Sequence, residues 1–118
     1  MIKNEKRLHI IAQFSNYRSS FGIIIDDIKL YFSNIIKKVW LLELWNYYYE
    51  FWKDAYTWVI CLAESHISIH TWPESKYLTL DIYVCNYEKD NSLKAKEIFN
   101  ELKNFYNPEI IKVKYITR

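Results

Sequence analysis

Apolar and polar residues alternate along much of this chain, which is typical of strands that bury one face. The alternation is clearest at residues 67–72 and 77–85. Further strands are predicted at residues 8–14, 39–51, 56–63 and 110–116. The segment 39–51 is long, aromatic and poor in helix-capping residues, so we expect a strand with an irregularity near Asn46.

Two other segments space their apolar residues at intervals of three and four, which predicts helices that each bury one side. The first begins at Asp26 or Asp27 and runs to about residue 38, and the second begins at 91 or 92 and stops before Pro108. The apolar stripes are Ile28, Phe32, Ile35 and Ile36 in the first helix, and Ala95, Ile98, Phe99 and Leu102 in the second.

The predicted order is strand, helix, four strands, helix, strand. One mainly antiparallel sheet with the two helices on one face would give a two-layer α/β sandwich of the α+β class. No linker or internal repeat interrupts the pattern, so we expect residues 1–118 to form a single domain.

Composition narrows the possible functions. A single glycine among 118 residues excludes the Gly-rich phosphate loops of nucleotide-binding folds. The net charge of +2 comes from interspersed acids and bases, so nucleic-acid binding is not indicated. No apolar run approaches the roughly 20 residues that cross a bilayer. We expect a cytoplasmic protein, with most of its aromatic residues in the core.

The cysteines and histidines do not by themselves indicate a site. Cys61 and Cys85 form neither a disulfide framework nor a CxxC motif, and no metal site is predicted. Taken alone, Cys61 and Cys85 are both interpreted as buried core residues. A structural role is favoured for His9, and the role of His66 is left open.

One segment points to chemistry. Residues 63–74 read Ala-Glu-Ser-His-Ile-Ser-Ile-His-Thr-Trp-Pro-Glu. This segment resembles the self-cleavage motif of prokaryotic S-adenosylmethionine decarboxylase proenzymes, which are pyruvoyl enzymes. The resemblance extends without a gap from Leu8 to Cys85.

The resemblance implies that the chain cuts its own backbone between Glu64 and Ser65. The Ser65 hydroxyl attacks the Glu64 carbonyl, and β-elimination then leaves a β chain, 1–64, and an α chain, 65–118, that begins with a pyruvoyl group. That group forms a Schiff base with the amine of a small amino-acid-type substrate and withdraws electrons while carbon dioxide leaves.

The resemblance also assigns roles in processing. His70 matches the processing base, and Thr57 stands where the family has a serine that supports processing. On a regular strand Ser65 and His70 would lie on opposite faces, because they are five residues apart. We therefore expect a break in regular structure at the cleavage turn that brings the two together.

Three further residues match family positions that act on the substrate. Cys85 matches the proton donor to the substrate carbon, Phe51 matches a phenylalanine that stacks on adenine, and Glu74 matches the acid that binds the ribose hydroxyls. The resemblance further implies a homodimer whose active sites are built near the interface from both protomers.

The chain departs from the family pattern around the expected pocket. Gln13 replaces a glutamate, Ala55 and Trp58 replace glycines, and Ser75-Lys76 replaces a Gly-Tyr pair. Trp58 is the bulkiest change, and we expect it next to the pocket. The favoured reaction is decarboxylation of S-adenosylmethionine for spermidine biosynthesis. The alternatives are a decarboxylase of ornithine or arginine, and a non-catalytic dimerising homologue.

Overall fold

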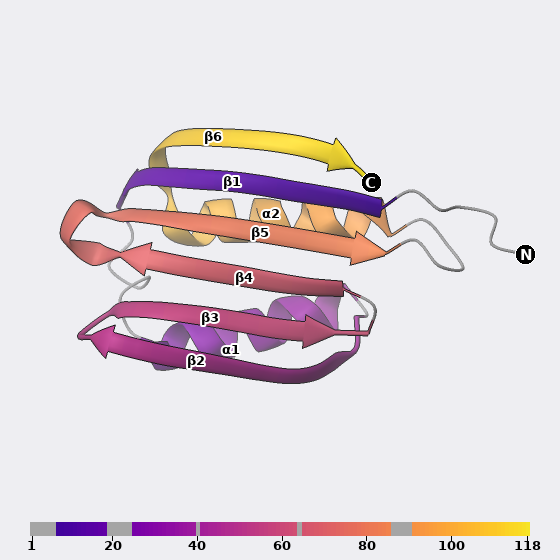
Figure 1. Cartoon of the computed structure of the whole chain (residues 1–118), viewed down its shortest axis with the longest axis horizontal. Helices are drawn as coiled ribbons and strands as arrows, with labels where there is room; N and C mark the ends of the chain where they lie inside the picture. Colours follow the sequence, from indigo (N-terminus) through magenta and orange to yellow (C-terminus); the bar gives the residue numbers. More distant parts are fainter. Residues whose placement is uncertain (1–6, 19–24, 40, 64, 86–90) are drawn as a thin grey trace, which may run out of the picture.

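The computed structural model describes residues 7–18, 25–39, 41–63, 65–85 and 91–118, with only the backbone of Ile25 and Cys85. The elements are β1 (Arg7–Tyr17), α1 (Ile25–Lys38), β2 (Glu43–Trp52), β3 (Ala55–Leu62), β4 (Ser65–Trp72), the short 3-10 helix η2 (Pro73–Ser75), β5 (Tyr77–Cys85), α2 (Ser92–Tyr106) and β6 (Pro108–Thr117). This order is the predicted one (Figure 1).

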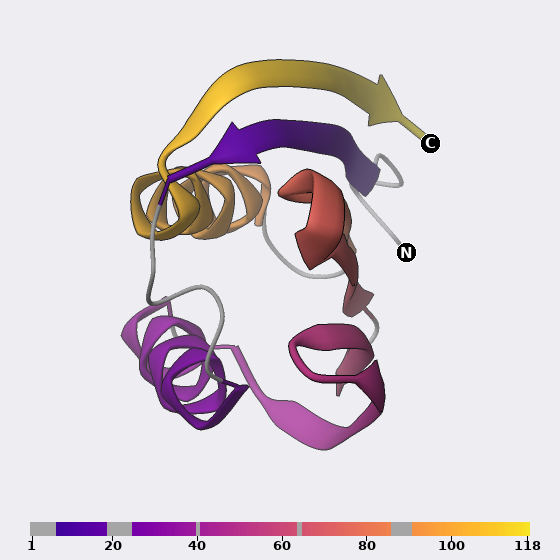
Figure 2. The ribbon, with the colours of Figure 1, turned by 90° about the vertical axis from the view of Figure 1, so that its left-hand side faces the viewer.

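The six strands form one antiparallel sheet in the order β2-β3-β4-β5-β1-β6. Both helices lie on the same side of this sheet, with α1 behind β2 and β3 and α2 behind β5 and β1 (Figures 1 and 2). The predicted two-layer α+β sandwich is therefore confirmed.

The covered face follows from the alternation in the sequence. The predicted helix stripes are buried, as are the even-numbered residues of β3 and β5 and the odd-numbered residues 67–71 of β4. Acidic residues stand in the first turn of α1 and lysines in its last turn, where each charge opposes the helix dipole.

The aromatic strand β2 differs from the prediction in two ways. It begins at Glu43 instead of residue 39, although the irregularity expected near Asn46 is present as a register shift between Glu43 and Trp45, with a second shift between Glu50 and Trp52. The core expectation is also wrong for this strand, because five of its aromatic side chains are more than half exposed: Trp45, Tyr47, Tyr49, Phe51 and Trp52. β2 is an edge strand, and neither α1 nor α2 covers the face on which most of these rings lie (Figure 2).

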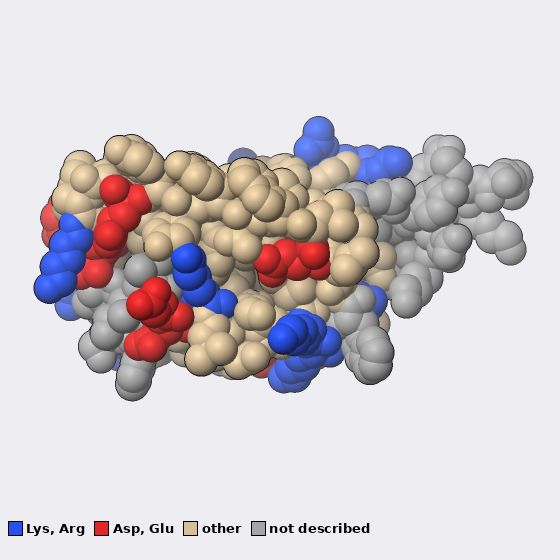
Figure 3. All heavy atoms as spheres, turned by 90° about the horizontal axis from the view of Figure 1, so that it is seen from below, with Lys and Arg blue, Asp and Glu red and all other residues tan. Residues whose placement is uncertain are grey.

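The surface at the β2 edge of the molecule is largely uncharged. Seen from the β2 edge, acidic and basic side chains are scattered among uncharged residues without a continuous basic surface (Figure 3). No described helix is long and apolar enough to cross a membrane.

Candidate active site

The sheet face that the helices leave uncovered, called here the open face, carries most of the polar side chains that the sequence singled out. It receives the residues that alternate with the buried ones, among them Thr57 on β3, His66 and His70 on β4, and Tyr83 on β5. Cys61 lies on this face and is half-buried, so its assignment to the core is wrong. The alternation that fills the core thus also sorts the reactive groups onto the other side.

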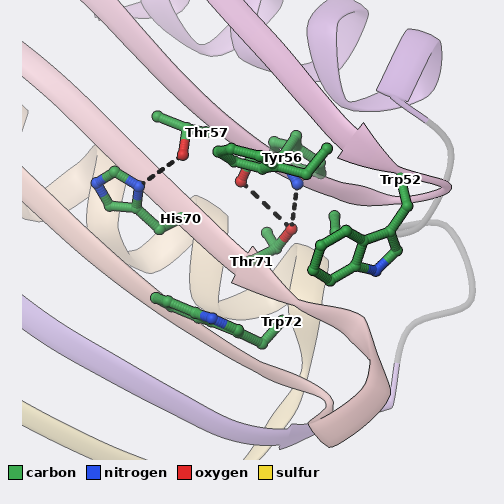
Figure 4. A pocket seen from close by; sticks show the side chains of 8 residues that line it. Trp52, Tyr56, Thr57, His70, Thr71 and Trp72 are labelled. Carbon is green, nitrogen blue, oxygen red and sulfur yellow. Dashed lines mark hydrogen bonds between the residues drawn. The ribbon is translucent and has the colours of Figure 1, made fainter.

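Thr57 and His70 form a directly opposed pair on β3 and β4. The Thr57 hydroxyl oxygen lies 2.9 Å from Nδ1 of His70, within hydrogen-bond distance (Figure 4). This contact holds the imidazole ring against β3. A ring held in this way can exchange a proton in a fixed direction.

A cavity of about 280 Å³ opens beside this pair at the end of β2, β3 and β4 (Figure 4). Its lining consists of Phe51, Trp52, Ala55, Tyr56, Thr57, His70, Thr71 and Trp72. The lining is mostly aromatic and contains no carboxylate. The structure thus brings Phe51, Thr57 and His70 together, as a shared site requires.

Glu74 lies near this cavity but not in its lining. It is an exposed residue of η2, directly after Trp72 and Pro73.

Trp58 does not lie next to the cavity, so the prediction for this residue is wrong. It is only 3% exposed, packs edge-to-face on Phe32 of α1, and donates a hydrogen bond from Nε1 to Oδ1 of Asn46. Because Trp58 is an even-numbered residue of β3, it faces the helices and not the cavity. Ala55, the other glycine replacement on β3, does line the cavity.

Ser65 lies at the opposite end of β4 from His70. The β3–β4 pairing runs residue by residue from Leu62–Ser65 to Thr57–His70. The expected break that would bring Ser65 and His70 together is therefore wrong: they are five positions apart on one continuous strand, a distance of about 16 Å. The Ser65 hydroxyl is exposed and lies 3.4 Å from the Ala63 carbonyl oxygen.

The other two residues at this end are described only in part. Glu64 lies outside the described residues, and Cys85 is described by its backbone alone. Cys85 ends β5, and β5 is antiparallel to β4 with His66 opposite Tyr83. The start of β4 at Ser65 and the end of β5 at Cys85 therefore lie side by side (Figure 1).

The same end of the open face carries an aromatic and basic cluster. The rings of His9 and His66 flank Tyr83, and the Arg118 guanidinium lies over the Tyr83 ring at 5.1 Å. Burial lowers the pKa of His9, and the charges of Arg118 and His66 add to this against the opposing effect of Asp81. Within the described ranges, no group of three possible ligands could hold a metal ion.

Sequence reasoning missed four residues of the cavity: Trp52, Tyr56, Thr71 and Trp72. Thr71 and Trp72 stand inside the recognised motif, and Trp52 follows Phe51 directly, so their positions were visible. Nothing in a single sequence separates them from neighbouring core residues.

Comparison with known proteins gives consistent similarities. The family model described as S-adenosylmethionine decarboxylase matches residues 8–118. The chain is 38% identical to the S-adenosylmethionine decarboxylase proenzyme of Persephonella marina over 92 residues, 76% of this chain and 67% of that protein. It is 32% identical to the proenzyme of Thermoplasma volcanium, over 94% of this chain and 82% of that protein.

A solved structure shares the fold. The adenosylmethionine decarboxylase from Aquifex aeolicus VF5 superposes with a TM-score of 0.83 at 30% identity, covering 98% of this chain and 92% of that one. The similarity therefore extends over both the sheet and the helix layer.

Proposed function

The chain belongs to the S-adenosylmethionine decarboxylase family, and we propose that it cuts its own backbone between Glu64 and Ser65 to become active. Members of this family are pyruvoyl-dependent decarboxylases made as proenzymes, and the chain is accordingly a decarboxylase of S-adenosylmethionine. The product is used for spermidine biosynthesis, which supports a cytoplasmic setting.

The cavity is the observation that carries the choice of substrate. The three exposed aromatic side chains of its lining, Phe51, Trp52 and Trp72, suit a flat adenine ring and a positively charged sulfonium, both of which bind favourably to aromatic faces. Ornithine or arginine would bring a second cation that needs a carboxylate partner. Because the cavity lining has no carboxylate, it favours S-adenosylmethionine over these alternatives.

The position of Ser65 fits the formation of a pyruvoyl group. The bond to be cut lies between the last residue of β3, Leu62, and the first of β4, Ser65, so cleavage there interrupts neither strand. The cut leaves position 65 as a new chain end at an exposed turn. A pyruvoyl group there supplies a carbonyl that withdraws electrons from the substrate as carbon dioxide leaves.

Each remaining residue has one task in the proposal. The Ser65 oxygen attacks the Glu64 carbonyl carbon, and the peptide nitrogen leaves it, so an ester replaces the amide. His70, held by Thr57, takes the proton from the Ser65 Cα, and the Glu64 carboxylate then departs. The dehydroalanine left at position 65 is hydrolysed by water, which gives the pyruvoyl group and releases ammonia. In turnover, Cys85 donates the proton that the substrate carbon takes up.

The separation of Ser65 from His70 supports a homodimer. A two-fold axis between two facing sheets, perpendicular to their strands, places the Ser65 end of β4 in one protomer against the His70 end of β4 in the partner subunit, and does so twice. Ser65 has the same period on β4 as the buried Ile67, so it reaches this site from the end of the strand and not from the open face. The open face and its exposed aromatic residues on β2 supply a surface for this packing. Each site then draws Ser65 and Cys85 from one protomer and the cavity from the other.

The intact mass of the purified protein tests the cleavage. We expect two chains, 1–64 and 65–118, the second without a free amino terminus, and a single uncut chain for Ser65→Ala. Release of labelled carbon dioxide from carboxyl-labelled S-adenosylmethionine, compared with ornithine and arginine, tests the substrate. A wild-type chain that stays uncut and releases no label would contradict the proposal.

A further inference from the structure

Strands β3 and β4 separate at the cavity. Their pairing ends at Thr57–His70. Beyond this pair, Ala55 and Tyr56 pair only with β2, while Thr71 and Trp72 pair only with β5. The cavity occupies the gap that this divergence leaves.

The Thr71 side chain bridges the gap that the backbone leaves open. Its hydroxyl oxygen accepts a hydrogen bond from the Tyr56 N–H at 3.0 Å and donates one to the Asp54 carbonyl at 3.1 Å. The Tyr56 carbonyl lies farther away, at 3.5 Å (Figure 4). Thr71 is 6% exposed, and its hydroxyl therefore makes these contacts out of water, where each is costly to lose.

The bridge ends on the β2–β3 turn. Asp54 has a φ of 67°, a left-handed conformation that is costly for a residue other than glycine, and its N–H donates to the Glu50 carboxylate at 3.0 Å. The turn directly follows Phe51 and Trp52, which form one wall of the cavity and are 57% and 60% exposed. The Phe51 ring packs on Tyr49 and Trp52, which belong to the same strand, so these contacts move with the hairpin and the placement of this wall depends on how the turn is held.

The opposite wall is held independently. Trp72 follows Thr71 on β4 and packs on Tyr77 of β5 with a ring separation of 5.5 Å. The width of the cavity is thus the distance between the turn of the β2–β3 hairpin and the end of β4. The Thr71 hydroxyl joins the two through its hydrogen bonds to Tyr56 and Asp54.

We propose that Thr71 is a positioning residue for substrate binding: its hydroxyl fixes the β2–β3 hairpin against β4 and so sets the width of the cavity that receives the base of the substrate. This inference rests on the proposed function, because it takes the cavity as the substrate site. Thr71 itself takes no part in cleavage or decarboxylation.

The experiment compares Thr71→Val, Thr71→Ser and a matched control, Ile69→Val, in cleaved protein. Ile69 is buried on the same strand but does not contact the hairpin turn, so the control lowers stability without releasing the turn. For Thr71→Val we expect KM to rise about tenfold while kcat changes less than about twofold. Thr71→Ser keeps the hydroxyl and retains the wild-type KM, and Ile69→Val lowers Tm but leaves KM unchanged.

Direct titration with S-adenosylmethionine, followed by tryptophan fluorescence, reads the same loss as a weaker Kd. Should Thr71→Val fail to fold, Thr71→Ala is measured with the same expectation. A wild-type KM and Kd in the hydroxyl-free variant would overturn the positioning role while leaving the proposed function intact. An unaltered protein that neither binds nor decarboxylates S-adenosylmethionine would overturn both.

Discussion

The two ends of β4 differ in almost every respect that matters for chemistry. At the His70 end the ring is hydrogen-bonded to Thr57 beside a cavity with aromatic walls. At the Ser65 end the hydroxyl is exposed, and its one hydrogen bond in the described part of the chain is a 3.4 Å contact to a backbone carbonyl. Under the proposed function, the first end positions a ligand and a base, and the second presents the bond for cleavage.

This difference shows why a rigid strand can be useful in a self-cleaving protein. A continuous ladder keeps the base about 16 Å from the bond within one protomer. Cleavage would then have to wait for a second folded copy, which ties activation to assembly. The predictions below test whether the two ends are halves of one site.

Mixing two inactive variants gives the largest expected effect. Ser65→Ala lacks the cleavage serine and His70→Ala lacks the base, so neither protein alone is expected to be cut or active. In a mixed dimer, Ser65 of one protomer meets His70 of the partner subunit at one of the two sites. Co-expression should therefore restore about a quarter of the wild-type activity, from random pairing in a two-fold dimer.

The control for this complementation is co-expression of Ser65→Ala with Ser65→Ala His70→Ala, which contains no cleavable serine. If co-expression of the two single variants restored neither cleavage, read by intact mass, nor activity, each site would be complete within one protomer. The assignment of the two ends to different protomers would then be wrong.

The Thr57–His70 contact predicts the next largest effect. Thr57→Val removes the hydroxyl that holds the ring at 2.9 Å and should slow self-cleavage about a hundredfold, the usual scale for a lost hydrogen-bonding group in an acyl-transfer site. Thr57→Ser keeps the hydroxyl and should cleave at least as fast as the wild type. The time course of cleavage after synthesis, followed by mass, measures both.

Thr79→Val is the matched control, because Thr79 is the neighbour of His70 on the other side, on β5. Equal cleavage rates for Thr57→Val and the wild type would show that the hydroxyl has no part in processing. Equal slowing by Thr79→Val would show that any change beside His70 has the same effect.

The residues between the sheet and the helices were predictable because buried apolar residues recur at regular intervals along the sequence. The stripe of α1 and the alternation of β5 each determine which residues face the core, and the structure follows both. Trp58 also follows this pattern, because the period of β3 places it toward the helices. The prediction that it lies next to the pocket rested only on its standing where the family has a glycine.

The open face was less predictable because its residues obey no single period. The rings of β2 carry the composition of a core strand, and only the absence of a covering helix leaves them exposed. The separation of Ser65 from His70 depends on whether β4 is regular across residues 65–70. The motif points to Ser65 and His70, but their spacing along one chain does not indicate whether one protomer or two would bring them together.

Replacement by alanine should therefore affect substrate binding at Phe51 and stability at Trp58. Phe51→Ala removes an exposed ring of the cavity and should raise KM about tenfold, the scale of one base–aromatic stacking contact, with little change in Tm. Trp58→Ala removes a buried ring and should cost about 3–5 kcal/mol of stability without a comparable change in KM. A rise in KM for Trp58→Ala equal to that for Phe51→Ala would place both residues at the substrate.

The smallest expected effect concerns His9, at the Ser65 end of the open face. Burial lowers the pKa of His9 below its unfolded value of 6.5, so below that pH the unfolded chain binds the proton more readily than the folded one. The contribution of His9 to stability is therefore complete above pH 6.5 and is lost as the pH falls through this value. His9→Gln should reduce the drop in Tm between pH 7.5 and 5 by about one or two degrees, because much of the ring is screened by solvent.

The measurement uses Ser65→Ala protein, so that cleavage does not contribute, and Ser68→Ala as a non-titrating control on the same face. An unchanged or steeper drop in Tm for His9→Gln would show that His9 does not stabilise this end of the sheet in its neutral form.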